Sequence, residues 1–260
     1  MTTDGQSDPR GIQRNRPEDV DALASTVISV LRGRQIVSAE GLRQFVLDHM
    51  MRAVLAKNHF APDVLLAELR GYRLTEDAII DQYVPKTARL LGDDWCNDKI
   101  SFADVTIGVM RLQALVSEAS IEMRLPGRTE FSGLTALVIV PQNEQHFLGA
   151  SVVAGQLRRL GCEVTMSFDE DFGSLASRLA CNVPDFALIT CARRETLETV
   201  AQTVQTIRSA AGEDIVVAVG GAIILEQDVV IELTGVDIVT SAAEDAAAYC
   251  ARRSGSRKAL

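Results

Sequence analysis

The apolar run LTALVIV is followed by Glu144, His146 and Gly149. The carboxylate and the imidazole are side chains that can bind a metal or a hydrogen-bonding partner. Histidine is a common metal ligand, and a nearby carboxylate can accept a hydrogen bond from its second ring nitrogen and fix its tautomer. The chain has only three histidines. A histidine in a surface loop is usually just a solvated side chain, so the interpretation of His146 depends on the residues at the ends of the other apolar runs.

Two further apolar runs also end in residues that suit a ligand. The run DFALI is followed by Thr190 and Ala192, and the run IVVAV by Gly220 and Gly221. A hydroxyl can hydrogen-bond a ligand, and paired glycines let a bulky planar group approach the backbone. The nucleotide-phosphate patterns GxGxxG and GxxxxGK[ST] occur at none of these strand ends. The three loops therefore predict a site for a ring-bearing ligand whose metal is bound by the imidazole.

These loops can meet only if the runs are strands of one sheet. From residue 134 onwards, five short apolar runs alternate with helical stretches, which is the pattern of a parallel sheet covered on both faces. A doubly wound sheet binds ligands at the carboxyl ends of its strands, near the point where strand order reverses. We predict a flavodoxin-like, five-stranded α/β domain over residues 127–253.

Residues 18–126 are predicted to form a helical bundle that precedes the sheet. Apolar residues recur there three and four apart, as one face of a helix requires. The expected N-caps are Ser38, Thr75 and Ser101. Pro62 is expected in the first turn of a helix and Gly71 just past its end. Pro85 predicts a kink or a break in its helix.

Composition limits the class of protein. The chain has 260 residues, of which 47% are hydrophobic and 23% charged, enough for two globular domains. It lacks an apolar run of membrane-spanning length. Residues 1–17 lack the apolar core of a secretory signal and are expected to be a flexible tail. Five scattered cysteines without a CxxC pair favour a reducing, cytoplasmic location over a disulfide framework or a structural zinc site.

The net charge of −9 disfavours non-specific nucleic-acid binding by the surface as a whole. Both ends of the chain are nevertheless basic, including the tail 254–260. Disorder and solubility are the ordinary explanation of such tails, so any contact with DNA is expected to be secondary.

The pattern E-x-H-x-x-G, T-x-A, G-G resembles the D-x-H-x-x-G, S-x-L, G-G signature of cobalamin-binding domains. The 40 residues 150–189 separate the first two motifs and the 27 residues 193–219 separate the last two, close to the spacings of that family. Such domains often have an upstream helical cap. The segment LLGDDWCNDKISFADV resembles the part of the cap whose tryptophan, here Trp95, lies beside the upper face of the cofactor.

The resemblance implies base-off cobalamin with His146 as the lower cobalt ligand and Glu144 polarising its other ring nitrogen. Thr190 would lie near the base of the nucleotide tail, and Gly220 and Gly221 would leave space along that tail. Glu144 stands where the family has mostly Asp, and its extra methylene is expected to loosen the carboxylate–imidazole pair. Thr for Ser keeps the hydroxyl, whereas Ala192 for Leu enlarges the cavity.

The upper face departs from one branch of the family. In light-sensing repressors with this architecture, a Glu-His pair follows the tryptophan after nine residues, and Val105 and Thr106 stand at those positions here. Cys96 is either an upper ligand or, as a buried cysteine usually is, a small apolar filler. Trp95 has core packing as its alternative role. The remaining histidines, His49 and His59, are expected to be structural or solvated.

The degenerate signature, the polar N-terminal extension, the single helical cap and the lack of a catalytic module resemble the AerR/PpaA family of antirepressors of photosynthesis genes in purple bacteria. This resemblance implies a non-enzymatic, light- or redox-responsive regulator whose partner is a DNA-binding repressor of the CrtJ/PpsR type. Two alternatives stay open. One is a corrinoid carrier of a methyltransferase system, and the other is a haem-binding regulator in which His146 ligates iron.

Overall fold

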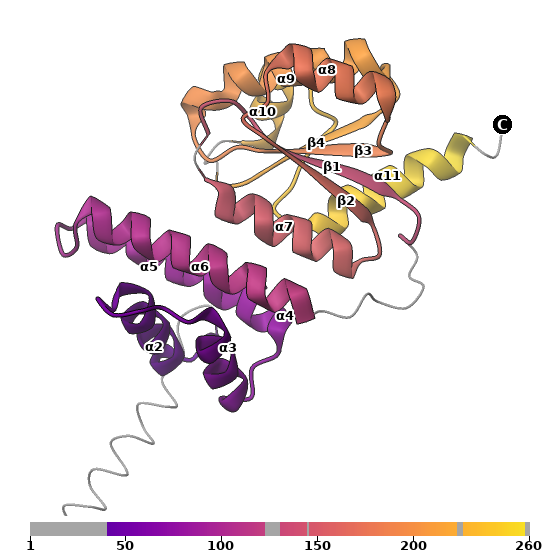
Figure 1. Cartoon of the computed structure of the whole chain (residues 1–260). Coiled ribbons are helices and arrows are strands. Elements are labelled where there is room, and N and C mark those ends of the chain that lie inside the picture. The colour runs from indigo at the N-terminus through magenta and orange to yellow at the C-terminus, as the bar shows by residue number, and fades with distance from the viewer. Residues whose placement is uncertain (1–40, 123–130, 145, 223–225, 258–260) are drawn as a thin grey trace, which may run out of the picture. The chain divides into compact units, whose positions relative to one another are not determined.

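The computed structural model describes residues 41–122, 131–144, 146–222 and 226–257 (Figure 1). Residues Met50–Leu260 belong to one compact unit. The predicted boundaries after residues 17 and 126 lie outside the described residues, and so does the expected N-cap Ser38. The last helix, α11 (Ala243–Arg257), continues past residue 253, so residues 254–257 of the expected basic tail are helical.

Helices fill the N-terminal half of the described chain. They are α2 (Gln44–Leu55), α3 (Pro62–Gly71), α4 (Glu76–Ala78), α5 (Val84–Cys96) and α6 (Phe102–Glu122). Pro62 opens α3 as predicted. The Thr75 hydroxyl accepts the Ala78 N–H at 3.2 Å. Ser101 and Asp104 bond each other's backbone N–H groups at 3.1 and 3.0 Å, which closes the start of α6.

Gly71 is the last residue of α3 rather than the residue beyond it, so that expectation is wrong by one position. The chain leaves the helix through Tyr72, whose N–H bonds the Glu68 and Leu69 carbonyls at 3.2 and 3.1 Å. Arg73, two residues past the helix, adopts a left-handed conformation at φ 59°.

Pro85 predicts a kink or a break in its helix, and the structure shows a change of helix type just before it. A π-helical turn, η1 (Ile79–Tyr83), lies between α4 and α5, and the Val84 N–H bonds the carbonyl of Ile79, five residues earlier. Proline has no N–H, and its ring crowds the carbonyl four residues before it. The wider π turn accommodates both effects, so the chain stays helical from residue 76 to residue 96.

The C-terminal half contains the predicted five-stranded parallel sheet. Its strands are β1 (Thr135–Val140), β2 (Glu163–Phe168), β3 (Phe186–Thr190), β4 (Val216–Gly220) and β5 (Ile238–Val239). They lie in the order β2-β1-β3-β4-β5, and each neighbouring pair is parallel. This is the flavodoxin-like order, so the predicted fold class is confirmed.

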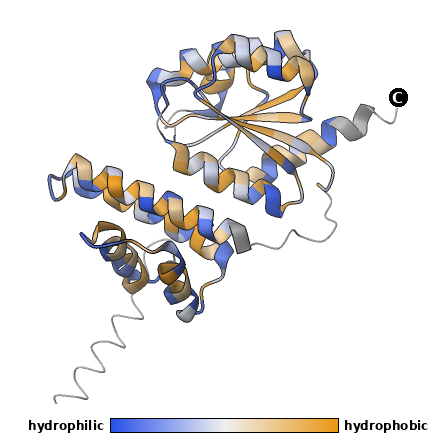
Figure 2. Cartoon of the chain, viewed as in Figure 1, coloured by the Kyte–Doolittle hydropathy of each residue, from blue (hydrophilic) through white to orange (hydrophobic). Residues whose placement is uncertain are grey.

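Helices cover both faces of the sheet (Figure 1). One face packs on α7 (Phe147–Arg159) and α11, and the other on α8 (Phe172–Cys181), α9 (Leu197–Ala211) and α10 (Gln227–Thr234). Figure 2 shows hydrophobic strands between helices of mixed hydropathy. Burial on both faces explains why the three central strands, β1, β3 and β4, are continuous apolar runs.

Polar contacts join the N-terminal helices to α7. The Gln113 side chain of α6 hydrogen-bonds the Ser151 hydroxyl of α7. At the other end of α7, Arg159 pairs with Asp77 of α4 at 3.1 Å and with Asp81 of η1. In the described part of the chain, no helix combines the length and apolarity that crossing a membrane requires.

Candidate functional site

The three predicted loops follow neighbouring strands. β1, β3 and β4 are adjacent and parallel, so their carboxyl ends lie along one edge of the sheet. The first connection leaves β1 for β2 on one side, and the later ones continue from β3 on the other side. The strand order therefore reverses between β1 and β3, which is where ligands bind in this class of fold.

The loop after β1 holds a buried carboxylate against an exposed imidazole. The Glu144 side chain is only 1% exposed, whereas that of His146 is 60% exposed. Glu144 Oε1 accepts the His146 backbone N–H at 3.1 Å and also contacts ring nitrogen Nδ1. The extra methylene of Glu144 therefore still lets the carboxylate reach the ring. With Nδ1 engaged, Nε2 is the ring nitrogen left for a metal.

Residues from two other strands brace this loop. Asn143 adopts a left-handed conformation at φ 64°, which asparagine tolerates better than most residues. Its N–H bonds Asp169, just after β2, and its carbonyl accepts from Arg193, just after β3, both at 3.3 Å. Sequence reasoning missed Asp169 and Arg193. Their positions one residue past β2 and three residues past β3 are the signal that could have identified them.

The start of α7 leaves open space beside the imidazole. Gly149 lies in the first turn of the helix, and a Cβ there would meet none of the described atoms within 4 Å. Glycine inside a helix costs about 0.5–1 kcal/mol relative to alanine, and packing of the described chain does not require it here. The exposed rings of Phe147 and Phe168 meet at 5.7 Å in an edge arrangement. An apolar surface therefore adjoins the start of α7.

The loops after β3 and β4 bond to each other and to β1. Thr190 is 8% exposed, and its hydroxyl donates to the Ile139 carbonyl of β1 at 3.3 Å. A Cβ at Gly220 would lie 3.0 Å from the Thr240 carbonyl oxygen. Gly221 has φ 137°, and a Cβ there would collide with the Cys191 carbonyl. The chain's own packing therefore requires Gly221 and leaves little room for a side chain at Gly220.

Cys191 and Ala192 complete the turn after β3. Cys191 is buried, and its thiol lies 3.3 Å from both the Arg193 carbonyl and the Thr196 hydroxyl. Thr196 ends the short 3-10 helix η2 (Arg194–Thr196). Burial raises the pKa of the Cys191 thiol, and the nearby Glu144 charge adds to that shift. Ala192 is partly exposed at the turn.

Trp95 is not a core residue, because its side chain belongs to the exposed large hydrophobics at 44% exposure. Its ring meets that of Phe102, also exposed, with centroids 5.8 Å apart. This ring contact joins α5 to α6 and does not involve the strand-end loops. Thr106 bonds the Phe102 carbonyl at 2.9 Å. Cys96 is exposed, so its interpretation as a buried filler is wrong.

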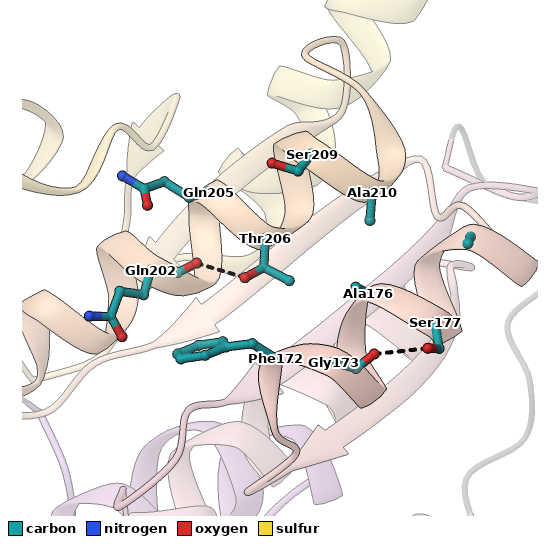
Figure 3. Close-up of a pocket in the computed structure, with 10 residues that line it drawn as sticks. Phe172, Gly173, Ala176, Ser177, Gln202, Gln205, Thr206, Ser209 and Ala210 are labelled. Carbon is teal, nitrogen blue, oxygen red and sulfur yellow. Dashed lines mark hydrogen bonds between the residues drawn. The ribbon is translucent and has the colours of Figure 1, made fainter.

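The site can thus hold a metal through one imidazole backed by a carboxylate. Among the described residues, no three His, Cys, Asp or Glu side chains gather as a metal cluster. A separate open hollow lies between α8 and α9 and is lined by small and polar side chains such as Ala176 and Thr206 (Figure 3). It includes none of the predicted site residues.

Comparison with known proteins gives one sequence relative and several structural neighbours. No family model matches the chain. Over 179 residues it is 36% identical to an uncharacterized 20.5 kDa protein from the bchF-crtJ intergenic region of Rhodobacter capsulatus. That match covers 69% of this chain and 93% of the relative.

Among solved structures, the monomethylamine corrinoid protein of Methanosarcina barkeri superposes with a TM-score of 0.61 at 15% identity, covering 80% of this chain and 96% of that one. A cobalamin-binding protein of Desulfitobacterium hafniense DCB-2 gives a TM-score of 0.42 at 14% identity, covering 80% and 98%. At such identity the first likeness shows a shared fold.

Proposed function

This chain belongs to the same family as the 20.5 kDa protein of the bchF-crtJ region of Rhodobacter capsulatus, and on that basis we propose that it is a cobalamin-binding antirepressor of the AerR/PpaA type. The observation that supports cobalamin is the Glu144–His146 pair at the carboxyl end of β1, beside the reversal of strand order. The fold shared with a corrinoid protein adds support.

In this proposal His146 would hold the cobalt through Nε2. Glu144 fixes the ring through Nδ1 and keeps the imidazole a good ligand, as carboxylates behind metal-bound histidines do. Asp169 and Arg193 hold the loop in place through Asn143. Gly149 leaves the exposed first turn of α7 without a side chain, so a large group could approach its backbone. When bound, cobalamin would supply a cobalt centre that responds to light or redox state.

The regulatory part of the proposal rests on the relative and on α7. The relative's gene region is named for crtJ, and a CrtJ/PpsR-type repressor is the partner that the resemblance implies. A ligand can shift a protein between two states only if it binds them with different affinity. α7 begins beside His146 and pairs with the N-terminal helices at Ser151 and Arg159. It is therefore the element through which a change at cobalt reaches the helices.

Haem is a second candidate ligand, and one observation favours it. Thr190, Gly220 and Gly221, which would hold a nucleotide tail, are engaged by the chain itself. Haem has no such tail, and His146 could ligate iron in the same way.

The test is the absorption spectrum of the purified full chain titrated with hydroxocobalamin or haemin, in darkness and after blue-green light. Wild type and the control His59→Ala, which changes an exposed histidine elsewhere, should retain cobalamin with a shifted spectrum. His146→Ala should lose the shift. Uptake of haemin with a Soret band, without retention of cobalamin, would replace the corrinoid by haem.

A second measurement separates a regulator from a carrier. The regulator should show a light- or redox-dependent spectral change and a matching change in its binding to a CrtJ/PpsR-type repressor. Turnover of a methyl donor by the loaded protein, together with no effect on the repressor, would favour a corrinoid carrier.

A further inference from the structure

The first half of α6 exposes large hydrophobic side chains on one face. Phe102 is 65% exposed and Met110 is 67% exposed. With Thr106 between them they are spaced four residues apart, so the three side chains lie along one side of the helix. Gln113, three positions after Met110, continues this face and bonds Ser151 of α7. The exposed face is therefore an extension of the face that α6 turns towards α7.

Two contacts fix the direction of α7 relative to α6. Gln113, near the middle of α6, bonds Ser151, whereas Arg159 in the last turn of α7 pairs with Asp81 of η1. η1 leads directly into α5, which packs on α6 after a short connection, so the start of α5 lies beside the end of α6. α7 therefore runs in the same direction as α6. Its start, next to His146, points towards the exposed first half of α6.

Position along the two helices brings Met110 to the level of His146. A helix rises about 1.5 Å per residue, so His146 lies about 7.5 Å before Ser151. On α6, Met110 lies about 4.5 Å and Thr106 about 10.5 Å before Gln113, on either side of that level. Helical side chains lean towards the start of their helix, which moves the Met110 sulfur closer to it. The shorter Thr106 side chain bonds back to its own helix at 2.9 Å. Met110 is therefore the side chain of this face that can reach a group bound at His146.

We propose that Met110 supplies the second axial ligand of the metal that His146 would hold. This rests on the proposed cobalamin-binding function. A thioether is a soft metal ligand, and histidine with methionine is the axial pair of the haem iron in cytochromes c. Ligation forms a bond from the Met110 sulfur to cobalt and releases the water on the other face of aquacobalamin, with no proton or electron transferred.

The first test is the pH dependence of the absorption spectrum of the full chain loaded with hydroxocobalamin in darkness. A water on cobalt loses a proton as the pH rises from about 6 to about 10, because the metal lowers its pKa. Wild type should lack this transition. Met110→Leu keeps the size and removes the sulfur, and it should retain cobalamin through His146 and show the transition. Ile107→Leu, at another exposed hydrophobic residue of α6, is the matched control and should behave as wild type. Because Met110 is exposed, its substitution should leave the Tm of the ligand-free protein unchanged.

X-ray absorption at the cobalt edge gives the second test. Wild type should show a sulfur atom bound to cobalt, and Met110→Leu should not. Sulfur that persists in Met110→Leu but is lost in Cys96→Ser would assign the ligand to Cys96 and overturn the inference. The same pH-dependent transition in wild type and Met110→Leu would also overturn it, while leaving the proposed function intact. If wild type retains no cobalamin, both are wrong.

Discussion

At the residue scale, the candidate site is a pair of side chains in opposite environments. A buried carboxylate is costly unless hydrogen bonds compensate it. The Oε1 atom of Glu144 is compensated by the backbone N–H and the ring of His146. The same bonds therefore fix the direction in which the imidazole faces and leave Nε2, the nitrogen proposed to bind the metal, outside the pair.

Glu144→Gln tests this orientation. The amide has the same size, but it loses the charge, and its NH2 group can donate to Nδ1, which favours the tautomer with a proton on Nε2. We expect corrinoid affinity about 10- to 100-fold lower, as for other partners of metal-bound histidines. The measurement is a corrinoid titration of Glu144→Gln and of a control, Glu163→Gln, which changes an exposed glutamate of β2. Equal affinity of the two variants would mean that the carboxylate does not orient the ring.

At the scale of elements, α7 connects the site to the N-terminal helices. Its first turn contains Gly149 next to His146, and its last turn contains Arg159, which pairs with Asp77 and Asp81. Asp81 lies in the π turn that precedes Pro85. Such turns are often found at functional positions. This one brings the Asp81 carboxylate against Arg159 of α7, the helix that begins beside His146.

Arg159→Ala should destabilise the protein by about 1–2 kcal/mol, since partly buried Asp81 loses its charged partner. Arg158→Ala removes the neighbouring arginine, whose bond to the Val164 carbonyl is exposed, and should cost less. Urea unfolding of the two variants measures the difference. Identical unfolding midpoints would show that the Arg159 pairs contribute nothing to stability.

At the scale of the whole molecule, the two helical layers bury three of the five thiols. Cys162, Cys191 and Cys250 are buried, whereas Cys96 and Cys181 are exposed. Burial raises the pKa of the Cys162 thiol to about 11 and also raises that of Cys191. The thiolate is the reactive form, and a raised pKa lowers its share at any pH below that value.

Native protein at pH 8 should therefore react quickly with a thiol reagent such as DTNB at Cys96 and Cys181 only. The other three thiols should react after denaturation in urea. Raising the pH to 9 should still not admit Cys162, because burial raises the pKa of its thiol to about 11. Rapid reaction of a third thiol in the folded protein would contradict the packing of the sheet.

The sequence predicts the strands and their covering helices because burial on both faces leaves an unbroken apolar run. It also predicts Glu144 beside His146, because two positions of separation keep that contact local. The role of Gly221 is different, because the contact that requires it is with Cys191, far away in sequence. The bracing by Asp169 and Arg193 also depends on the order of the strands, which apolar runs alone do not determine.

The strand order β2-β1-β3 also affects the order in which parts of the fold can form during synthesis. β1 is made first but lies between two strands that are made later, and Thr135 at its start is bonded to Asp185, 50 positions along the chain. On the ribosome, His146 therefore emerges well before Arg193, which braces its loop. Pairings so distant along the chain form slowly. A newborn chain must complete β3 before Arg193 can brace the loop that contains His146, so we expect any cofactor to be loaded after the closure of the sheet.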